Sequence, residues 1–165
     1  RTPLFDDSYN ASPASVVSAL RDLGGLTLKT GQRRAACLGE MRELGESSER
    51  MHRMIGAESA KQGIDLLVCC GMFASAMAEG ARANGMKDQQ VAMAHDAPEA
   101  GIFLQDRIRQ GDIILIKGSE GPRPGKTGWG TVTGVRMDRV VKELMAEPLR
   151  AKELLCRQEE SWQRR

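Results

Sequence analysis

The sequence has 165 residues, of which 41% are hydrophobic and 28% are charged, a composition typical of one globular domain. A chain of this length buries roughly 70% of its unfolded surface, so it needs no metal or disulfide to hold its fold. Lys and Arg total 24 against 22 Asp and Glu, giving a net charge of +2. This balance argues against a protein that binds nucleic acid or a membrane surface.

Membrane segments and cysteine-based sites are not indicated. The longest apolar runs, such as residues 66–70, are far shorter than the ~20 residues that span a bilayer. No signal peptide is recognisable, and because the first residue is Arg1 rather than Met, we expect a piece of a longer chain. The cysteines lack C-x-x-C spacing and a nearby His cluster, which predicts a reducing, cytoplasmic location without a zinc site. They are Cys37, Cys69, Cys70 and Cys156.

The first predicted elements are a short strand over residues 2–6 and a helix. Ser12 at the N-cap and Pro13 at the first helical position begin the helix, and the pair Gly24-Gly25 ends it. Apolar residues at near-3.6 spacing form its expected inner face: Val16, Val17, Leu20 and Leu23.

The next predicted pair is a strand over residues 33–38 and a helix over 49–62. Ser47 or Ser48 is the expected cap of this helix. Its expected inner face consists of Met51, Met54 and Ile55.

The second half of the chain continues the alternation of strands and helices. The apolar strand 65–70 suits a parallel strand buried on both faces, and a helix over 73–83 follows it. We then expect, in order, a strand over 90–94, a helix over 97–109, a strand over 113–117 and a Gly- and Pro-rich loop over 118–135.

The last helix is expected to begin near Met137 and to break at Glu147-Pro148, because Pro disfavours helix at the preceding residue. We therefore expect one domain over residues 1–148 and a charged tail over 149–165.

Strands that alternate with helices predict an α/β fold with a mostly parallel sheet and helices on both faces. In such sheets a ligand binds outside the carboxyl ends of the strands. Three stretches that follow strands are the candidate sites: Asp6–Pro13, Gly39–Glu46 and Gly118–Arg136.

The stretch 6–13 carries two carboxylates, a hydroxyl, a phenol and an amide just before a helix. Carboxylates accept from ribose hydroxyls, an amide can bind a purine edge, and the helix start offers N–H groups to an anion. The alternative interpretation is structural, with Asp6 and Asp7 in a turn and Ser12 only as a cap.

Four segments together resemble the C-terminal domain of the Mur ligases. The stretch 6–13 is similar to Asp-Asp-Ser-Tyr-Asn-Ala-(Asn/Ser)-Pro, and 38–45 to Leu-Gly-Asp-Met-x-Glu-Leu-Gly. Residues 111–119 resemble Gly-Asp-x-x-Leu-x-Lys-Gly-Ser, and an Arg-Met follows at 136–137. The resemblance spans about residues 4 to 144, in matching order. It implies a Rossmann-like three-layer sandwich.

The sequence departs from the family pattern at three places. Ser12 replaces Asn, Glu40 replaces Asp, and residues 120–135 are inserted between Lys-Gly-Ser and Arg-Met. The insertion contains a Gly-Lys-Thr at 125–127, but Glu120 stands where a P-loop needs its first Gly. Two prolines also remove N–H donors there, so a basic surface loop is the preferred interpretation.

The resemblance implies a domain of an ATP-dependent amide ligase of peptidoglycan synthesis. Such enzymes form an acyl phosphate from a substrate carboxylate and ATP with Mg²⁺, and an amine then attacks it. Within the family the pattern is most similar to members that add D-alanyl-D-alanine to UDP-MurNAc-tripeptide. The UDP-sugar domain and the central ATPase domain, which would hold most of the Mg²⁺ contacts, are not represented here, so we expect the chain alone to be inactive.

The resemblance also assigns roles to individual residues. Asp7 would bind the ribose of ATP, and Tyr9 and Asn10 would lie near the adenine or the phosphates. Lys117 and Ser119 would face the incoming dipeptide or the acyl phosphate, and Glu40 would contact the incoming amine. No residue is assigned as a general base or as a metal ligand.

Other hypotheses remain open from the sequence. The chain fits a sister Mur or folylpolyglutamate-type ligase domain with another amino substrate, or a nucleotide-binding module without catalysis. A redox role for Cys69-Cys70 is disfavoured, because a buried strand predicts inert thiols. His52 is expected to pack or cap rather than bind a ligand, and His95 with Asp96 is expected to lie in a loop between strand and helix.

Overall fold

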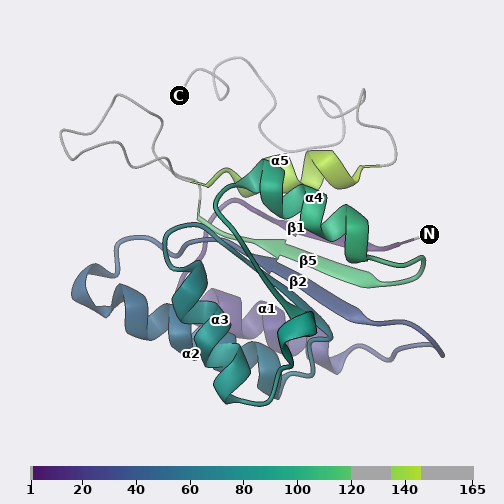
Figure 1. The fold of residues 1–165 in the computed structure, drawn as a ribbon, viewed down its shortest axis with the longest axis horizontal. Coiled ribbons are helices and arrows are strands. Elements are labelled where there is room, and N and C mark those ends of the chain that lie inside the picture. Colours follow the sequence, from purple (N-terminus) through teal and green to yellow (C-terminus); the bar gives the residue numbers. More distant parts are fainter. Residues whose placement is uncertain (1, 120–134, 146–165) are drawn as a thin grey trace.

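The computed structural model describes residues 2–119 and 135–145 (Figure 1). Five strands form one parallel sheet with the order β1-β5-β2-β3-β4. They are Leu4–Asp7 (β1), Arg34–Leu38 (β2), Leu66–Cys70 (β3), Val91–Ala94 (β4) and Ile113–Lys117 (β5). The helices are Pro13–Gly25 (α1), Ser48–Lys61 (α2), Ala74–Ala83 (α3), Ala97–Arg107 (α4) and Met137–Leu144 (α5). The predicted α/β fold is confirmed.

The path of the chain across the sheet explains why helices cover both faces. From β1 through β4 the chain moves in one direction, and it then returns to place β5 between β1 and β2. Because crossovers between parallel strands are right-handed, this reversal puts α4 on the face opposite to α1, α2 and α3. Figure 1 shows α4 and α5 together on one side of the sheet. Two apolar cores result, one on each side of the sheet.

Helix α1 begins as the sequence predicts. The Ser12 hydroxyl accepts the N–H of Ser15, and the Ser15 hydroxyl accepts the N–H of Ser12, so the two form a reciprocal cap. Val16, Leu20 and Leu23 are buried, and Val17 packs partly buried against the same core.

Helix α2 differs from the prediction at its start and on its inner face. A short 3₁₀ turn, Gly45–Ser47, precedes it; Ser47 makes no side-chain cap, and the Ser48 hydroxyl donates to the carbonyl of Gly45. Met54 is 41% exposed, so its predicted inward position is wrong. The buried residues of this helix are His52, Ile55, Gly56 and Ser59.

Close contact with α3 explains that inner face. A Cβ on Gly56 would lie 1.9 Å from the Met77 carbonyl oxygen, and a Cβ on Gly80 would lie 1.9 Å from that of Arg53. The backbones of α2 and α3 therefore touch through two glycines. Since residues two apart point to nearly opposite sides of a helix, turning Gly56 towards α3 turns Met54 outwards.

The remaining elements agree closely with the prediction. All five residues of β3 are buried, and β5 has the predicted bounds. Helix α4 ends at Arg107, two residues before the predicted end. Among the described residues, no helix has the length and apolarity to cross a membrane. Residues 120–134 of the predicted loop 118–135 lie outside the described residues, as do the predicted break at Pro148, the tail over 149–165 and Cys156.

Candidate functional site

The segments that follow β1, β2 and β5 meet at one end of the sheet. Strand β5 lies between β1 and β2, with Lys117 paired in register to both Asp7 and Leu38. The three candidate stretches therefore leave the sheet side by side. The structure describes the first two in full, and of the third it describes residues 118–119 and 135–136.

Lys117 is a buried cation that organises the loop after β1. Its side chain is 2% exposed, and its Nζ donates to Asp7 Oδ2 at 2.6 Å and to the Asn10 carbonyl oxygen at 2.9 Å. A lysine is rarely buried without such partners. Asp7 keeps 49% of its side chain exposed, so this ion pair orients a carboxylate that still reaches solvent.

Ser119 joins the loops after β1, β2 and β5 through hydrogen bonds. Its hydroxyl accepts the N–H of Ala11 at 3.1 Å and lies 3.0 Å from the Ala11 carbonyl oxygen. Its backbone N–H donates to the Glu40 carbonyl oxygen at 2.8 Å. Ser119 is 4% exposed, so in this structure it fixes the loops rather than facing solvent.

Tyr9 and Asn10 lie on the exposed part of the loop between β1 and α1. Tyr9 is 54% exposed, and the Asn10 side-chain oxygen accepts the N–H of Ala11 at 2.9 Å. The structure thus brings Asn10, Asp7, Lys117 and Ser119 together, with Tyr9 on the same loop.

Glu40 connects the loop after β2 with the turn after β3. It is 7% exposed, and its Oε1 accepts the N–H of Met72 at 2.7 Å. Gly71 has a φ of +100°, and a Cβ there would lie 2.6 Å from that same oxygen. The turn therefore requires glycine for conformation and for space.

Gly39, after β2, and Gly118, after β5, make room for the start of α5. A Cβ on Gly39 would lie 2.8 Å from the Met137 side chain, and one on Gly118 would lie 2.6 Å from it. Met137 is 1% exposed. The Arg-Met motif is therefore held next to the site, because Met137 packs against Gly39 and Gly118.

His52 is a neutral, fully buried histidine that holds the loop after β2. Its Nε2 accepts the N–H of Met41 at 2.9 Å, so its Nδ1 carries the proton and donates to the Ser48 carbonyl at 2.7 Å. The ring stacks on Phe73 with centroids 4.6 Å apart. Burial lowers the pKa of His52, while the bond to Ser48 and the charge of Glu40 act in the opposite direction. The predicted packing role is confirmed.

His95 and Asp96 are placed at the start of α4. Asp96 caps this helix by accepting the N–H of Glu99 at 2.9 Å, and the backbone N–H of His95 donates to the Glu99 carboxylate. The sequence Asp-Ala-Pro carries the signature of a capped helix start, so this cap was readable from the sequence.

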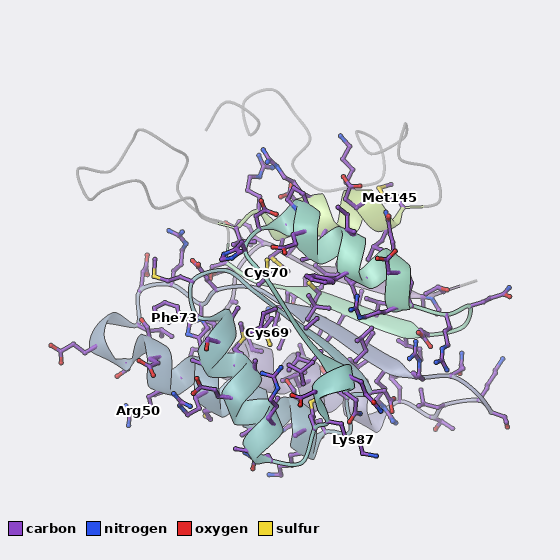
Figure 2. All side chains as sticks on the ribbon, viewed as in Figure 1. Arg50, Cys69, Cys70, Phe73, Lys87 and Met145 are labelled. Atoms are coloured by element: carbon purple, nitrogen blue, oxygen red, sulfur yellow. The ribbon has the colours of Figure 1, made fainter. Side chains whose placement is uncertain are left out.

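The cysteines of the sheet are inert thiols. Cys37, Cys69 and Cys70 are buried in the two cores, and Figure 2 shows Cys69 and Cys70 in the interior of the molecule. Burial raises the pKa of Cys69 and of Cys70 to about 12, so both stay protonated at neutral pH. Among the described residues no group of three or more His, Cys, Asp or Glu is arranged to hold a metal.

Two pockets border the site. One, of about 310 Å³, lies beside the edge strand β1 and is lined by Phe5, Asp6, Asp7 and apolar residues of α1. The other, of about 270 Å³, lies between the loop 40–45 and the residues Met72 and Phe73. Sequence reasoning singled out the stretch 39–46 but missed Arg42, which lines this second pocket.

The sequence of this chain is similar to those of known ligases. A family profile described as "Mur ligase, glutamate ligase domain" matches residues 1–120. The UDP-N-acetylmuramoyl-tripeptide–D-alanyl-D-alanine ligase of Bacillus subtilis is 29% identical over 150 residues, which is 88% of this chain and 28% of that enzyme. The enzyme with the same name from Synechocystis is 31% identical over 87% of this chain and 28% of its own length.

Solved structures show the same relationship. A crystal structure of MurF from Acinetobacter baumannii is 31% identical, with a TM-score of 0.61 over 72% of this chain and 26% of that one. The Thermotoga maritima MurF ligase in complex with ADP, 24% identical with a TM-score of 0.59, shares the fold. The chain spans about 28% of the length of its curated relatives. The chain belongs to the family of Mur ligase C-terminal domains.

Proposed function

We propose that the chain is the C-terminal domain of an ATP-dependent ligase that adds D-alanyl-D-alanine to UDP-MurNAc-tripeptide for peptidoglycan synthesis. The observation that carries the proposal is the family match over residues 1–120 together with curated relatives that bear this enzyme name. The Lys117–Asp7 cluster at the carboxyl end of the sheet supports it, since ligands of α/β sheets bind there.

The loop after β1 is the proposed contact of this domain with ATP. Asp7 is held by Lys117 yet half exposed, which suits a carboxylate that accepts from ribose hydroxyls. Tyr9 and Asn10 lie on the same loop and would contact the adenine or the phosphates. Lys117 acts on ATP through Asp7 in this arrangement, because its own Nζ is buried.

The loops after β2 and β5 are the proposed contact with the incoming dipeptide. Glu40 and Ser119 are joined by a hydrogen bond between their backbones. Glu40 would contact the amine, and Lys117 and Ser119 would face the dipeptide or the acyl phosphate. Lys117 and Ser119 are both buried here, so such contacts require a change in the loop after β5 when substrate binds.

The chemistry needs parts of the enzyme beyond this chain. A substrate carboxylate attacks the γ-phosphorus of ATP, ADP leaves, and the amine displaces phosphate from the resulting acyl phosphate to form the amide. Positioning and charge stabilisation supply most of the acceleration. The family resemblance places most of the Mg²⁺ contacts in the central domain of such ligases. We therefore propose that Mg²⁺ is bound mainly there and that this chain alone is inactive.

The test is a phosphate-release assay of the full-length ligase with ATP, UDP-MurNAc-tripeptide and D-alanyl-D-alanine. We expect dipeptide-dependent turnover, and we expect Asp7→Ala to raise the KM for ATP about 10- to 100-fold, as the loss of a charged hydrogen bond predicts. Asp106→Ala is the matched control and should leave the KM for ATP unchanged. Asp106 is exposed near the C-terminal end of α4.

Other results would redirect the proposal. Turnover only with a different amino acceptor would make the protein a sister ligase, including the folylpolyglutamate type. An absence of turnover with every acceptor would favour a nucleotide-binding module without catalysis. If Asp7→Ala and Asp106→Ala behaved alike, the ATP role of the loop after β1 would be wrong.

A further inference from the structure

The pocket between the loop 40–45 and the turn after β3 has no assigned occupant. Its volume of about 270 Å³ is just below the ~300 Å³ at which small-molecule sites usually begin, so it suits a small ligand. It borders the proposed substrate contacts, because Glu40 lines it and also accepts the backbone N–H of Ser119.

Arg42 lines this pocket, and some of its hydrogen-bond donors have no acceptor. Its side chain is 24% exposed, yet its Nε and one Nη are buried and make no hydrogen bond. Glu40 Oε2 lies 3.8 Å from that Nη, which is too far for a hydrogen bond, and Glu40 Oε1 is already used by the N–H of Met72. Arg42 and Glu40 thus form an ion pair without a hydrogen bond. Buried donors without acceptors are uncommon and unfavourable, so this guanidinium keeps donors for a second anionic partner.

The other pocket residues restrict what that partner is. Glu40 and Glu43 also line the pocket, so a phosphate with two negative charges would be repelled. A zwitterion fits better, because its carboxylate can approach Arg42 while its ammonium group approaches these carboxylates. The apolar walls supplied by Leu44, Met72 and Phe73 suit short aliphatic side chains.

We propose that Arg42 binds the terminal carboxylate of the incoming dipeptide and thereby selects an acceptor that carries this carboxylate. The inference rests on the proposed function, in which a zwitterionic dipeptide is the amino substrate. The guanidinium can form the planar, two-pronged pairing that matches a carboxylate, after a shift of the side chain that exposes its buried Nη. The amino group of the same molecule then lies towards Glu40.

The test compares D-alanyl-D-alanine with its C-terminal amide as acceptors for the full-length ligase. The wild-type enzyme should show a kcat/KM at least about 10-fold lower for the amide, because the amide lacks the charge that Arg42 recognises. Arg42→Gln should lower kcat/KM for the dipeptide by about 10- to 100-fold, mainly through KM, and should leave the value for the amide nearly unchanged. The KM values for ATP and for UDP-MurNAc-tripeptide should not change.

Two further variants separate recognition from folding. Arg50→Gln removes another arginine at the outer surface of α2 (Figure 2) and should not alter discrimination between acid and amide. Arg42→Lys keeps the charge without the two-pronged geometry and should retain part of the discrimination. Thermal unfolding of each variant checks that it is folded.

The outcomes distinguish this inference from the proposed function. Equal use of acid and amide by the wild type, or full discrimination in Arg42→Gln, overturns the role of Arg42 while leaving the ligase intact. No turnover of the dipeptide by the wild type overturns the proposed function, and this inference with it.

Discussion

At the scale of single residues, the buried ion pair of Lys117 and Asp7 determines how the site is held. The two residues are 110 positions apart, and Lys117 also holds the Asn10 carbonyl of the same loop. Because the Lys117 side chain donates to both groups, it anchors the loop after β1 to the neighbouring strand β5. Its role is therefore measurable in stability as well as in activity.

Replacing this lysine tests that anchor. Lys117→Met should lower the free energy of unfolding by about 1–3 kcal/mol, because the Asn10 carbonyl loses its donor and Asp7 its partner. Urea denaturation of the 165-residue chain measures this. Lys29→Met, at an exposed turn, should stay within about 0.5 kcal/mol of the wild type. Equal stability of the two variants would show that the ion pair does not anchor the loop.

His52 gives a prediction about pH. Its pKa is lowered in the folded state, so below about pH 6.5 the unfolded chain binds a proton that the folded chain excludes. Stability contributed by His52 is therefore complete above pH 6.5 and declines as the pH falls towards the folded pKa, by at most about 1.4 kcal/mol per pH unit. Unfolding measured from pH 7.5 to 5 should show this decline in the wild type. His52→Gln should show a shallower one, and identical slopes would contradict the account.

At the scale of elements, the contact of α2 with α3 depends on glycine. Gly56 and Gly80 allow the two backbones to touch, and this contact fixes which side of α2 carries His52 towards the loop after β2. The apolar periodicity of the sequence predicted that Met54 points inwards. This prediction was wrong because the side of α2 that faces α3 is set by Gly56, and a glycine does not count in an apolar pattern. By contrast, the bounds of β5 and the cap of α1 were predictable, since they depend on local residues alone.

Alanine at these glycines tests the close contact. Gly56→Ala and Gly80→Ala should each lower the free energy of unfolding by about 1–3 kcal/mol or more, because the added methyl group meets backbone atoms. Gly25→Ala, where nothing lies within 4 Å, should be neutral or slightly stabilising. Chemical denaturation of the three variants provides the comparison. A loss in Gly25→Ala equal to that in Gly56→Ala would contradict the helix contact.

At the scale of the whole molecule, the return of the chain to place β5 between β1 and β2 assembles the site. The sequence predicted that three stretches follow strands, and it could not predict which strands are neighbours, because that order is a property of the complete sheet. For the same reason the Lys117–Asp7 contact and the pocket around Arg42 were not predictable from local patterns. The family resemblance supplied the proposed roles of the site residues, and the structure supplies the contacts among them.

The measurement that tests the central claim most directly is product analysis of the full-length ligase by mass spectrometry. With ATP, UDP-MurNAc-tripeptide and D-alanyl-D-alanine, we predict a product heavier than the tripeptide substrate by one dipeptide less one water. Its formation should require both ATP and the dipeptide. A product formed only with another amino acceptor, or no product under any of these conditions, would contradict the account.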